Sequence, residues 1–543
     1  MARRFENSTH GKWARRDILK GFTILGGACL VAPWLPARAA DSPVKGGSLV
    51  MSLQTEPVGL VQGITTSSAT SSVSPHLFDG LVVVRKDGSL EPCLATSWEV
   101  TDAGKTVTFK LREGVRWHDG TPLTSADVQF SIMGIAKKVH PRGTATLASV
   151  IAVDTPDPLT AVLRFSSPAP VIWRALYGNE TMILPRHIYD TGKDDLFANP
   201  ANIRPVGTGP FRFKEWVKGS HLVLERNPDY WHPAEPHLDS LIFKFIKDPA
   251  ARTAALKTGE ISYAPNNPIS LQEVRAFQAN PEFTVDFEAY RDAATLYFFD
   301  FNLRKPLFQD HRVREAIALS IDRNLLSRTA WAGLATPATG PIPAYQKSNY
   351  NPHTVQYPFD PKRAEALLDE AGHPRGPGGI RFTIDHLPNP YGEPDRRSAL
   401  FFKQALKAVG IELEVKNFDT PTYLRKAFTD YDFDTHSAWY SSFLDPQIGV
   451  IRRFWSQSIK PGTPAANASG FADAEMDAVI DRIIHEGDEV KRHEAILEMQ
   501  ALAQQKLPSI NLLELPMFRV YSNRLHDLPP SALQSFGPSW LQS

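Results

Sequence analysis

Residues 111–131 read LREGVRWHDGTPLTSADVQFS, and this stretch carries clear turn and helix signals. Apolar and polar residues alternate from residue 106 into it, which is typical of a half-buried strand. The Asp-Gly pair at 119–120 favours a turn because glycine accepts a positive φ. Thr124 and Asp127 have the spacing of a capping box, so a helix is expected to begin after Thr124. The stretch therefore predicts a strand, a turn and a helix in succession.

The same stretch places His118 beside Asp119, with Asp127 eight residues further on, which raises the question of a catalytic pair. The alternative is that these side chains hold the backbone of the turns and of the helix start. Each of them has such a local role available. We therefore predict a structural joint and assign no catalytic residue.

Composition indicates a folded protein of several domains. The chain has 543 residues, and its 59 basic and 59 acidic residues leave a formal net charge of zero. Such a length exceeds what one compact core supports. A balanced charge gives no overall attraction to polyanions, so a nucleic-acid partner is not expected.

The first forty residues have the order of a cleavable export signal: charged, then apolar, then small residues. Arg15 and Arg16 are similar to the twin-arginine signal, which exports folded proteins. Cleavage is expected near Ala39, which predicts a periplasmic protein. An uncleaved anchor and a lipoprotein acceptor at Cys29 remain alternatives. The export signal is assigned to residues 1–39.

Short strands and amphipathic helices are mixed through the rest of the chain, which predicts an α/β fold. One helix is expected where Val313, Ile317, Ile321 and Leu325 recur at helical spacing. Further helices are expected at 361–371, between an Asp-Pro start and a glycine stop, at 396–409 ahead of a strand, and at 473–508 as a pair.

Catalytic and metal-binding signatures are absent from the sequence. There is no Gly-x-Ser-x-Gly elbow, no His-Glu-x-x-His zinc motif, no phosphate-binding loop and no complete dinucleotide motif. We therefore expect no cofactor, no metal site and no enzymatic activity. An exported hydrolase with an unfamiliar site remains an alternative.

Several aromatic residues lie in or beside loops rich in Ser, Asn and Asp. Aromatic walls with a few polar anchors are typical of clefts for small organic solutes. The other interpretation is that these rings belong to the core. The residues concerned are Phe301, Trp439, Tyr440, Phe443, Phe454 and Trp455.

Four stretches resemble one family, the extracytoplasmic solute-binding proteins of peptide, nickel and opine importers, called family 5. They are residues 111–131, VGTGPFRFKEWVKGSHLVLERNPDYW at 206–231, FNLRKPLFQDHRVREAIALSIDR at 301–323 and YDFDTHSAWYSSFLDP at 431–446. The resemblance implies a bilobal fold similar to the type II periplasmic binding proteins, with an additional embedded lobe. It also implies a monomer that carries a peptide-like small molecule to an ABC permease in the inner membrane.

By the same resemblance, lobe I is discontinuous and consists of residues 40–75, 205–285 and 505–543. Lobe II, the extra lobe, is expected at 76–204, and lobe III, the closing lobe, at 286–504. The solute cleft is then expected at loops between the lobes. The predicted ligand-binding residues are Gln54, Glu56, Thr208, Gly209, Asn389, Trp439, Tyr440, Ser441 and Ser442.

The resemblance also bears on the solute. Dipeptide-binding members hold the peptide carboxylate with an Arg and the amine with an Asp, and these positions match Asn389 and Ser442. Loss of two charged hydrogen bonds, at about 1.5–3 kcal/mol each, weakens such binding about 100-fold or more. A plain dipeptide is therefore not expected. A longer or modified peptide is expected, and an opine, a sugar conjugate, a metal chelate or haem stays open as an alternative.

Overall fold

A computed structural model shows the fold of the chain. The structure describes residues 43–65, 67–85, 89–140, 142–178, 180–192, 196–463 and 466–542. Residues 43–543 form one compact unit, and the predicted export signal, with Arg15, Arg16 and Cys29, lies outside the described residues.

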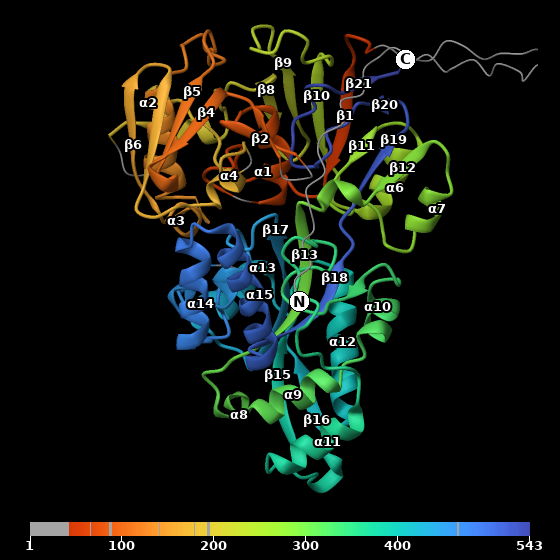
Figure 1. Cartoon of the computed structure of the whole chain (residues 1–543). Coiled ribbons are helices and arrows are strands. Elements are labelled where there is room, and N and C mark those ends of the chain that lie inside the picture. Colours follow the sequence, from red (N-terminus) through yellow and green to blue (C-terminus); the bar gives the residue numbers. More distant parts are fainter. Residues whose placement is uncertain are drawn as a thin grey trace, which may run out of the picture. The chain divides into compact units, whose positions relative to one another are not determined.

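Three sheets organise this unit (Figure 1). The first has seven strands in the order β12-β19-β11-β1-β10-β9-β8, with β1 parallel to β10 and to β11. Its strands are β12 (Phe283–Asp286), β19 (Arg519–Ser522), β11 (Tyr263–Ala264), β1 (Ser48–Leu53), β10 (Ser240–Phe245), β9 (His221–Arg226) and β8 (Phe211–Val217).

The second sheet has six strands in the order β14-β18-β13-β17-β15-β16. All nine residues of β13 are buried, which places this strand in the interior of its part of the molecule. The strands are β14 (Thr336–Pro337), β18 (Ser509–Leu515), β13 (Ala293–Phe301), β17 (Thr435–Phe443), β15 (Phe382–Leu387) and β16 (Ile411–Val415).

The third sheet has four antiparallel strands in the order β4-β5-β7-β6, and two strand pairs accompany the three sheets. The four strands are β4 (Ala95–Thr101), β5 (Thr106–Leu111), β7 (Thr160–Phe165) and β6 (Val150–Asp157). The pairs are β2 (Val82–Val84) with β3 (Leu90–Pro92), and β20 (Leu525–His526) with β21 (Trp540–Leu541).

The longer helices flank the first two sheets. They are α6 (Pro249–Lys257), α9 (His311–Leu319), α10 (Arg323–Ala330), α11 (Pro361–Glu370), α12 (Glu393–Ala408), α14 (Ala474–His485) and α15 (Glu489–Lys506). The shorter ones are α1 (Ser68–Val73), α2 (Ser125–Gln129), α3 (Gly143–Thr146), α4 (Ile172–Ala175), α5 (Arg186–Tyr189), α7 (Val274–Gln278), α8 (Pro306–Gln309) and α13 (Thr420–Arg425). The helix expected at 396–409 ahead of a strand is α12, followed by β16, and with the parallel strand β15 they form a crossover unit.

Local signals predicted most of these boundaries. Helix α11 begins with Pro361 after Asp360, whose side chain accepts from the backbone N–H of Arg363 at 3.0 Å. Gly372, with φ of +86°, follows its end. The strand, turn and capped helix expected at 111–131 are also confirmed.

The helix expected through Val313, Ile317, Ile321 and Leu325 is wrong as a single element. The structure divides it into α9 and α10, and the Leu325 side chain is 40% exposed. The physical reason is Asp322, whose carboxylate accepts from the Leu325 backbone N–H at 3.0 Å and starts a new helix there.

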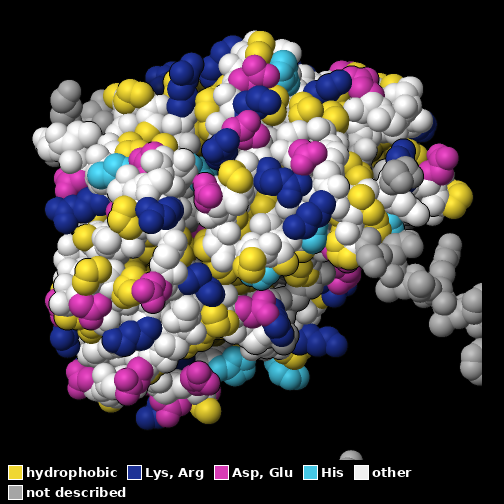
Figure 2. Space-filling model, turned by 90° about the horizontal axis from the view of Figure 1, so that it is seen from above, with side chains coloured by type: hydrophobic (Ala, Val, Ile, Leu, Met, Phe, Trp, Pro, Cys, Tyr) yellow, Lys and Arg dark blue, Asp and Glu magenta, His cyan; other side chains and the backbone are white. Residues whose placement is uncertain are grey.

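The chain passes directly between the two large sheets at two places, from the first to the second at β12–β13 and back to the first at β18–β19. One hydrophobic cluster includes buried residues from both sheets, among them Ala264 of β11 and Phe299 of β13. The face in Figure 2 carries interspersed basic and acidic side chains.

Candidate functional site

The conspicuous motif at 111–131 forms a structural joint. The His118 ring accepts a hydrogen bond at Nδ1 from the Gly207 backbone N–H, 3.1 Å away, and its Nε2 lies 3.1 Å from the Gly209 carbonyl oxygen. These partners fix the neutral ring with its proton on Nε2. Burial lowers the pKa of His118 to about 4. Because both ring nitrogens are engaged with backbone, the prediction of a structural role is confirmed.

The two acidic residues of the motif also form hydrogen bonds within the chain. Asp127 accepts from the Thr124 backbone N–H at 2.8 Å, which completes the predicted capping box, and from the Arg186 N–H at 2.9 Å. Asp119 accepts from the Thr121 N–H at 2.9 Å and lies 2.8 Å from Nε2 of His187. These contacts tie the turn and helix start to neighbouring chain segments.

Thr208 and Gly209, predicted at the cleft, lie in the same joint. A Cβ added to Gly207 would stand 1.8 Å from the Leu77 carbonyl oxygen, so the segments are in backbone contact. Thr208 is buried and donates to Asp79 Oδ2 at 3.1 Å. Burial raises the pKa of Asp79, whose carboxylate also accepts from Trp231 and Tyr230.

Gln54 and Glu56 are half-buried and hold two separate turns. Gln54 donates to the Asn267 carbonyl oxygen at 3.1 Å. Glu56 accepts from Nε1 of Trp216 at 2.8 Å and from the Gly219 N–H at 3.1 Å, which fixes the β8–β9 hairpin.

The remaining predicted residues divide between the two faces of β17 and the loop after β15. Tyr440 and Ser442 are buried: Tyr440 donates to the Pro341 carbonyl oxygen at 2.6 Å, and Ser442 donates to Gln346 at 2.9 Å. Asn389 is buried and accepts from the Tyr391 N–H at 3.0 Å. Trp439 and Ser441 point to the other face and are half-buried, and the Trp439 ring lies 5.9 Å from that of Tyr391.

Of the aromatic residues singled out as possible cleft walls, most are core. Phe301, Tyr440 and Phe454 are buried, whereas Trp439 and Trp455 are partly buried against the hydrophobic clusters. Phe443, at the end of β17, is different because it lines a pocket.

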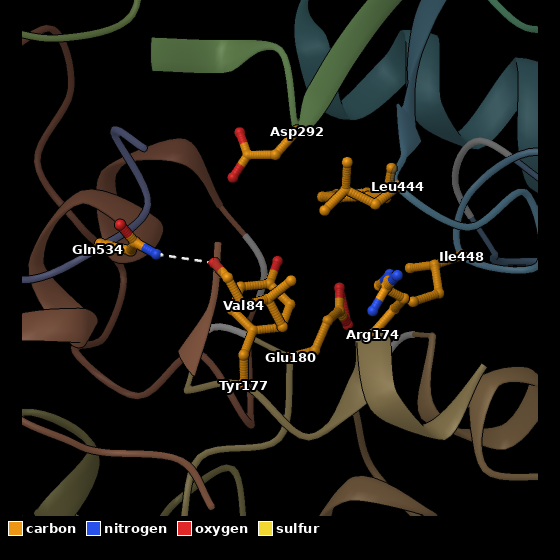
Figure 3. A pocket seen from close by; sticks show the side chains of 9 residues that line it. Val84, Arg174, Tyr177, Glu180, Asp292, Leu444, Ile448 and Gln534 are labelled. Atoms are coloured by element: carbon orange, nitrogen blue, oxygen red, sulfur yellow. Dashed lines mark hydrogen bonds between the residues drawn. The ribbon is translucent and has the colours of Figure 1, made fainter. Parts of the chain in front are cut away.

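That pocket is a candidate site (Figure 3). Its wall combines segments that are far apart in the sequence, and none of the nine predicted ligand-binding residues belongs to it. The lining residues are Val84, Arg174, Tyr177, Glu180, Asp292, Phe443, Leu444, Ile448 and Gln534. Gln534 donates to the Val84 carbonyl oxygen at 3.1 Å, as Figure 3 shows, so the C-terminal segment closes one side.

The pocket is nearly filled by its own walls. The empty volume is about 380 Å³, of which water-sized molecules reach only about 20 Å³ with their centres. That space admits little more than one water molecule. Entry of a larger solute therefore requires its walls to move apart.

The electrostatics of the pocket are set by Glu180, which is buried. Arg142 donates through Nε to both carboxylate oxygens, at 2.7 and 3.2 Å. His140 lies 3.8 Å from the same carboxylate, but burial lowers its pKa to about 4, so the ring is neutral near pH 7. Burial, together with the charges of Glu180 and Asp292, raises the pKa of Tyr177.

The comparison with protein families decides the class. The family model for the bacterial extracellular solute-binding proteins, family 5 (middle part), matches residues 89–460, more than half of the chain. The chain belongs to this family. A protein of Brucella ovis with the name of an ABC transporter peptide-binding protein is 32% identical to this family 5 protein over 398 residues, 72% of each chain.

Other relatives agree with this class. The glutathione-binding protein GsiB of Shigella boydii is 26% identical to this family 5 protein over 466 residues, which cover 84% of the chain and 86% of GsiB. The structure of AppA from Bacillus subtilis, in complex with a nonapeptide, matches with a TM-score of 0.80 and 23% identity over 92% of this chain and 100% of AppA. NikZ from Campylobacter jejuni, in complex with Ni(L-His), matches with a TM-score of 0.77 and 22% identity over 90% and 96%.

These likenesses confirm the α/β bilobal fold, similar to the type II binding proteins, for this family 5 protein. Within the described ranges, no three His, Cys, Asp or Glu side chains converge to hold a metal ion. None of the helices described has both the length and the apolar composition needed to cross a bilayer.

Proposed function

We propose that this family 5 protein captures a peptide-like solute in the pocket around Glu180 and Phe443 and delivers it unaltered to an ABC permease in the inner membrane. The observation that carries the proposal is the origin of the pocket wall. Val84 and Tyr177 come from the segment proposed as lobe II, whereas Asp292 and Phe443 come from the segment proposed as lobe III. A solute bound there touches both lobes, which is how a binding protein couples capture to closure.

The proposed lobes are those expected from the sequence, with lobe I at 40–75, 205–285 and 505–543. The chain crosses between the two large sheets at β12–β13 and β18–β19, after the proposed boundaries at 285 and 504, and we propose that it bends at these connections as the lobes separate. The small free volume of the pocket supports this proposal, because a solute enters only when the lobes open.

The names of the relatives support a peptide as the solute: one is called a peptide-binding protein and another a glutathione-binding protein. Asn389 and Ser442 are uncharged, and both form hydrogen bonds within the chain. They therefore cannot hold a plain dipeptide in the way that an Arg and an Asp do at the matching positions of dipeptide-binding members. The proposed solute is a longer or modified peptide.

Calorimetry and thermal unfolding of the purified protein test this proposal. Glutathione, tripeptides, simple dipeptides, an opine and Ni(L-His) form the panel. We expect at least one of the first two groups to bind and to raise the melting temperature without being converted. Micromolar binding of a simple dipeptide would contradict the argument from Asn389 and Ser442, and turnover of a peptide or ester would favour the exported hydrolase.

Export belongs to the same proposal. The protein is proposed to act as a periplasmic monomer, with no nucleic-acid partner, after cleavage near Ala39. Replacement of Arg15 and Arg16 by lysine is expected to leave uncleaved precursor in the cytoplasm in a fractionation experiment. Normal export of that variant would reject the twin-arginine assignment.

A further inference from the structure

Around the pocket, the positive charges of the arginine side chains outnumber the negative charges of the carboxylates. Two buried ion pairs form: Arg142 with Glu180, and Arg453 with Asp300 at 2.6 Å, where Nε and Nη1 of Arg453 have no hydrogen-bond partner among the described residues. Two further arginines, Arg174 and Arg452, lie at the same place. Among the described residues, no carboxylate lies within ion-pair distance of either guanidinium group.

Arg174 is part of the pocket wall itself. It lies in α4, and Figure 3 shows its guanidinium group between Glu180 and Ile448, at the right-hand side of the pocket. Within the described ranges, its side chain also has no hydrogen-bond partner. Arg174 is therefore a half-buried cation with its donors available to a solute.

Arg452 lies in the 3-10 turn Ile451–Arg453, four residues after Ile448 of the wall, and stands behind the lining residues. Its Nε contacts only the Gly449 carbonyl oxygen, at 3.4 Å. Burial, with the charges of Arg142 and Arg453, lowers the pKa of Arg452 to about 9, and Glu180 offsets part of this effect. The guanidinium groups of Arg142 and Arg452 thus both act on the Glu180 carboxylate at this corner of the pocket.

A cation with no partner at a partly dehydrated site raises the free energy of the folded protein. The charged groups named for the wall and the corner behind it are Arg142, Arg174, Arg452 and Arg453 against Glu180, Asp292 and Asp300, which leaves one positive charge in excess. Elsewhere the chain supplies the carboxylate itself: Asp445 accepts two hydrogen bonds from Arg492. The negative charge that would balance this excess is therefore expected on the solute.

We infer that the solute carries an additional carboxylate, which Arg174 and Arg452 bind, so that this protein selects acidic over neutral peptide-like solutes. The inference rests on the function proposed above and narrows its substrate class. A guanidinium group offers paired donors that match the two oxygens of a carboxylate. A solute with a cationic group at this position is repelled.

Matched tripeptides test the selectivity by calorimetry. Ala-Glu-Ala and Ala-Gln-Ala have nearly the same shape and differ by one charge. We expect the acidic peptide to bind at least 10-fold more tightly, and Arg174→Gln and Arg452→Gln each to reduce this ratio below about 3. In the control variant Arg482→Gln, which alters an exposed pair with Glu498, the ratio should persist. Equal affinities in the unaltered protein, or a ratio that survives both pocket variants, would overturn the inference.

A second measurement separates this inference from the proposed function. If neither tripeptide binds, the peptide assignment fails, and glutarate against glutaramide then tests charge selectivity in thermal unfolding. Stabilisation by glutarate alone supports an acidic solute, whereas an equal response to both compounds, or none, rejects it.

The ligand-free protein offers a test that needs no solute. Arg452→Met removes the excess charge but keeps most of the side-chain volume, so we expect an equal or higher melting temperature at low salt, with a smaller difference at 0.5 M NaCl. A melting temperature clearly below that of the unaltered protein would show that the chain itself compensates Arg452, and the inference would fall.

Discussion

The joint around His118 and the pocket around Arg174 differ in whether their polar side chains have partners within the chain. At the joint of His118, Gly207 and Asp79, the polar atoms described have partners within the chain. At the pocket of Arg174 and Arg452, two cations have no carboxylate partner in the described part of the chain. The joint is the more conspicuous in the sequence, yet the side chains of His118, Thr208 and Asp79 all have partners inside the chain. Polar groups that the fold leaves incomplete are the better indication of a binding site.

The largest effect is expected at the joint, from Gly207→Ala. The new Cβ would stand 1.8 Å from a backbone oxygen, which cannot move like a side-chain end. We expect a loss of more than about 4 kcal/mol in the free energy of unfolding, or no folded protein. The control Gly340→Ala has nothing within 4 Å of the new atom and should be nearly neutral. Urea unfolding of both variants measures this difference, and a Gly207→Ala loss below about 1 kcal/mol would break the comparison.

Arg492, unlike Arg452, has a buried carboxylate partner, so removal of that partner should lower the stability of the protein. Asp445 accepts two hydrogen bonds from Arg492, at 2.8 and 2.9 Å, and both side chains are buried. Asp445→Asn leaves the Arg492 charge without its partner, and a loss of about 3–5 kcal/mol is expected in urea unfolding. The control residue Glu498 forms an exposed ion pair with Arg482. Its replacement, Glu498→Gln, should lower the free energy of unfolding by less than about 1 kcal/mol. Similar losses in both variants would mean that burial does not decide the effect.

The joint should also be sensitive to acid. His118 has a folded-state pKa of about 4 against an ordinary value of 6.5, so below pH 6.5 the unfolded chain binds the extra proton. The stability contributed by the neutral ring is present above pH 6.5 and is lost as the pH falls toward 4.

His118→Asn keeps a group that can accept from the Gly207 N–H but leaves the Gly209 carbonyl without this donor. We expect a loss of about 1–3 kcal/mol at pH 7.5 and a shallower decrease between pH 6.5 and 4.5 than in the unaltered protein. Urea unfolding at several pH values measures both. An unchanged pH slope would exclude His118 as a source of the acid sensitivity.

The smallest change in stability is expected at the pocket, from Arg174→Gln. Because this side chain has no ion pair among the described residues, its replacement should alter the free energy of unfolding by no more than about 0.5 kcal/mol, although it weakens binding of an acidic solute. Thermal unfolding with and without solute measures both effects. A loss of stability comparable to that of His118→Asn would remove the distinction between the two regions.

Elements with short-range signals could be predicted from the sequence. The capping box at Thr124 and Asp127 and the limits of α11 follow from interactions between residues a few positions apart. The break at Asp322 was missed because apolar periodicity continues across a helix cap, and the cap alone marks the boundary.

The pocket could not be predicted in this way. Arg174, Asp292 and Gln534 meet only because the sheets bring distant segments together, and no local pattern marks them. Loop position and family resemblance suggested Thr208 and Ser442 instead, both of which the structure places inside the chain with internal partners. Phe443 was the one lining residue with a signal, as an aromatic residue beside a polar loop.

The sheet order has a consequence for biosynthesis. Strand β19 lies between β12 and β11, and β18 lies between β14 and β13, so two of the last strands to be made occupy interior positions of both large sheets. While the ribosome still holds the residues after position 508, neither sheet has its full set of neighbours. The nascent chain therefore reaches its native pairing only after translation is almost finished, and a message cut short before these strands yields a product with an open gap in each sheet.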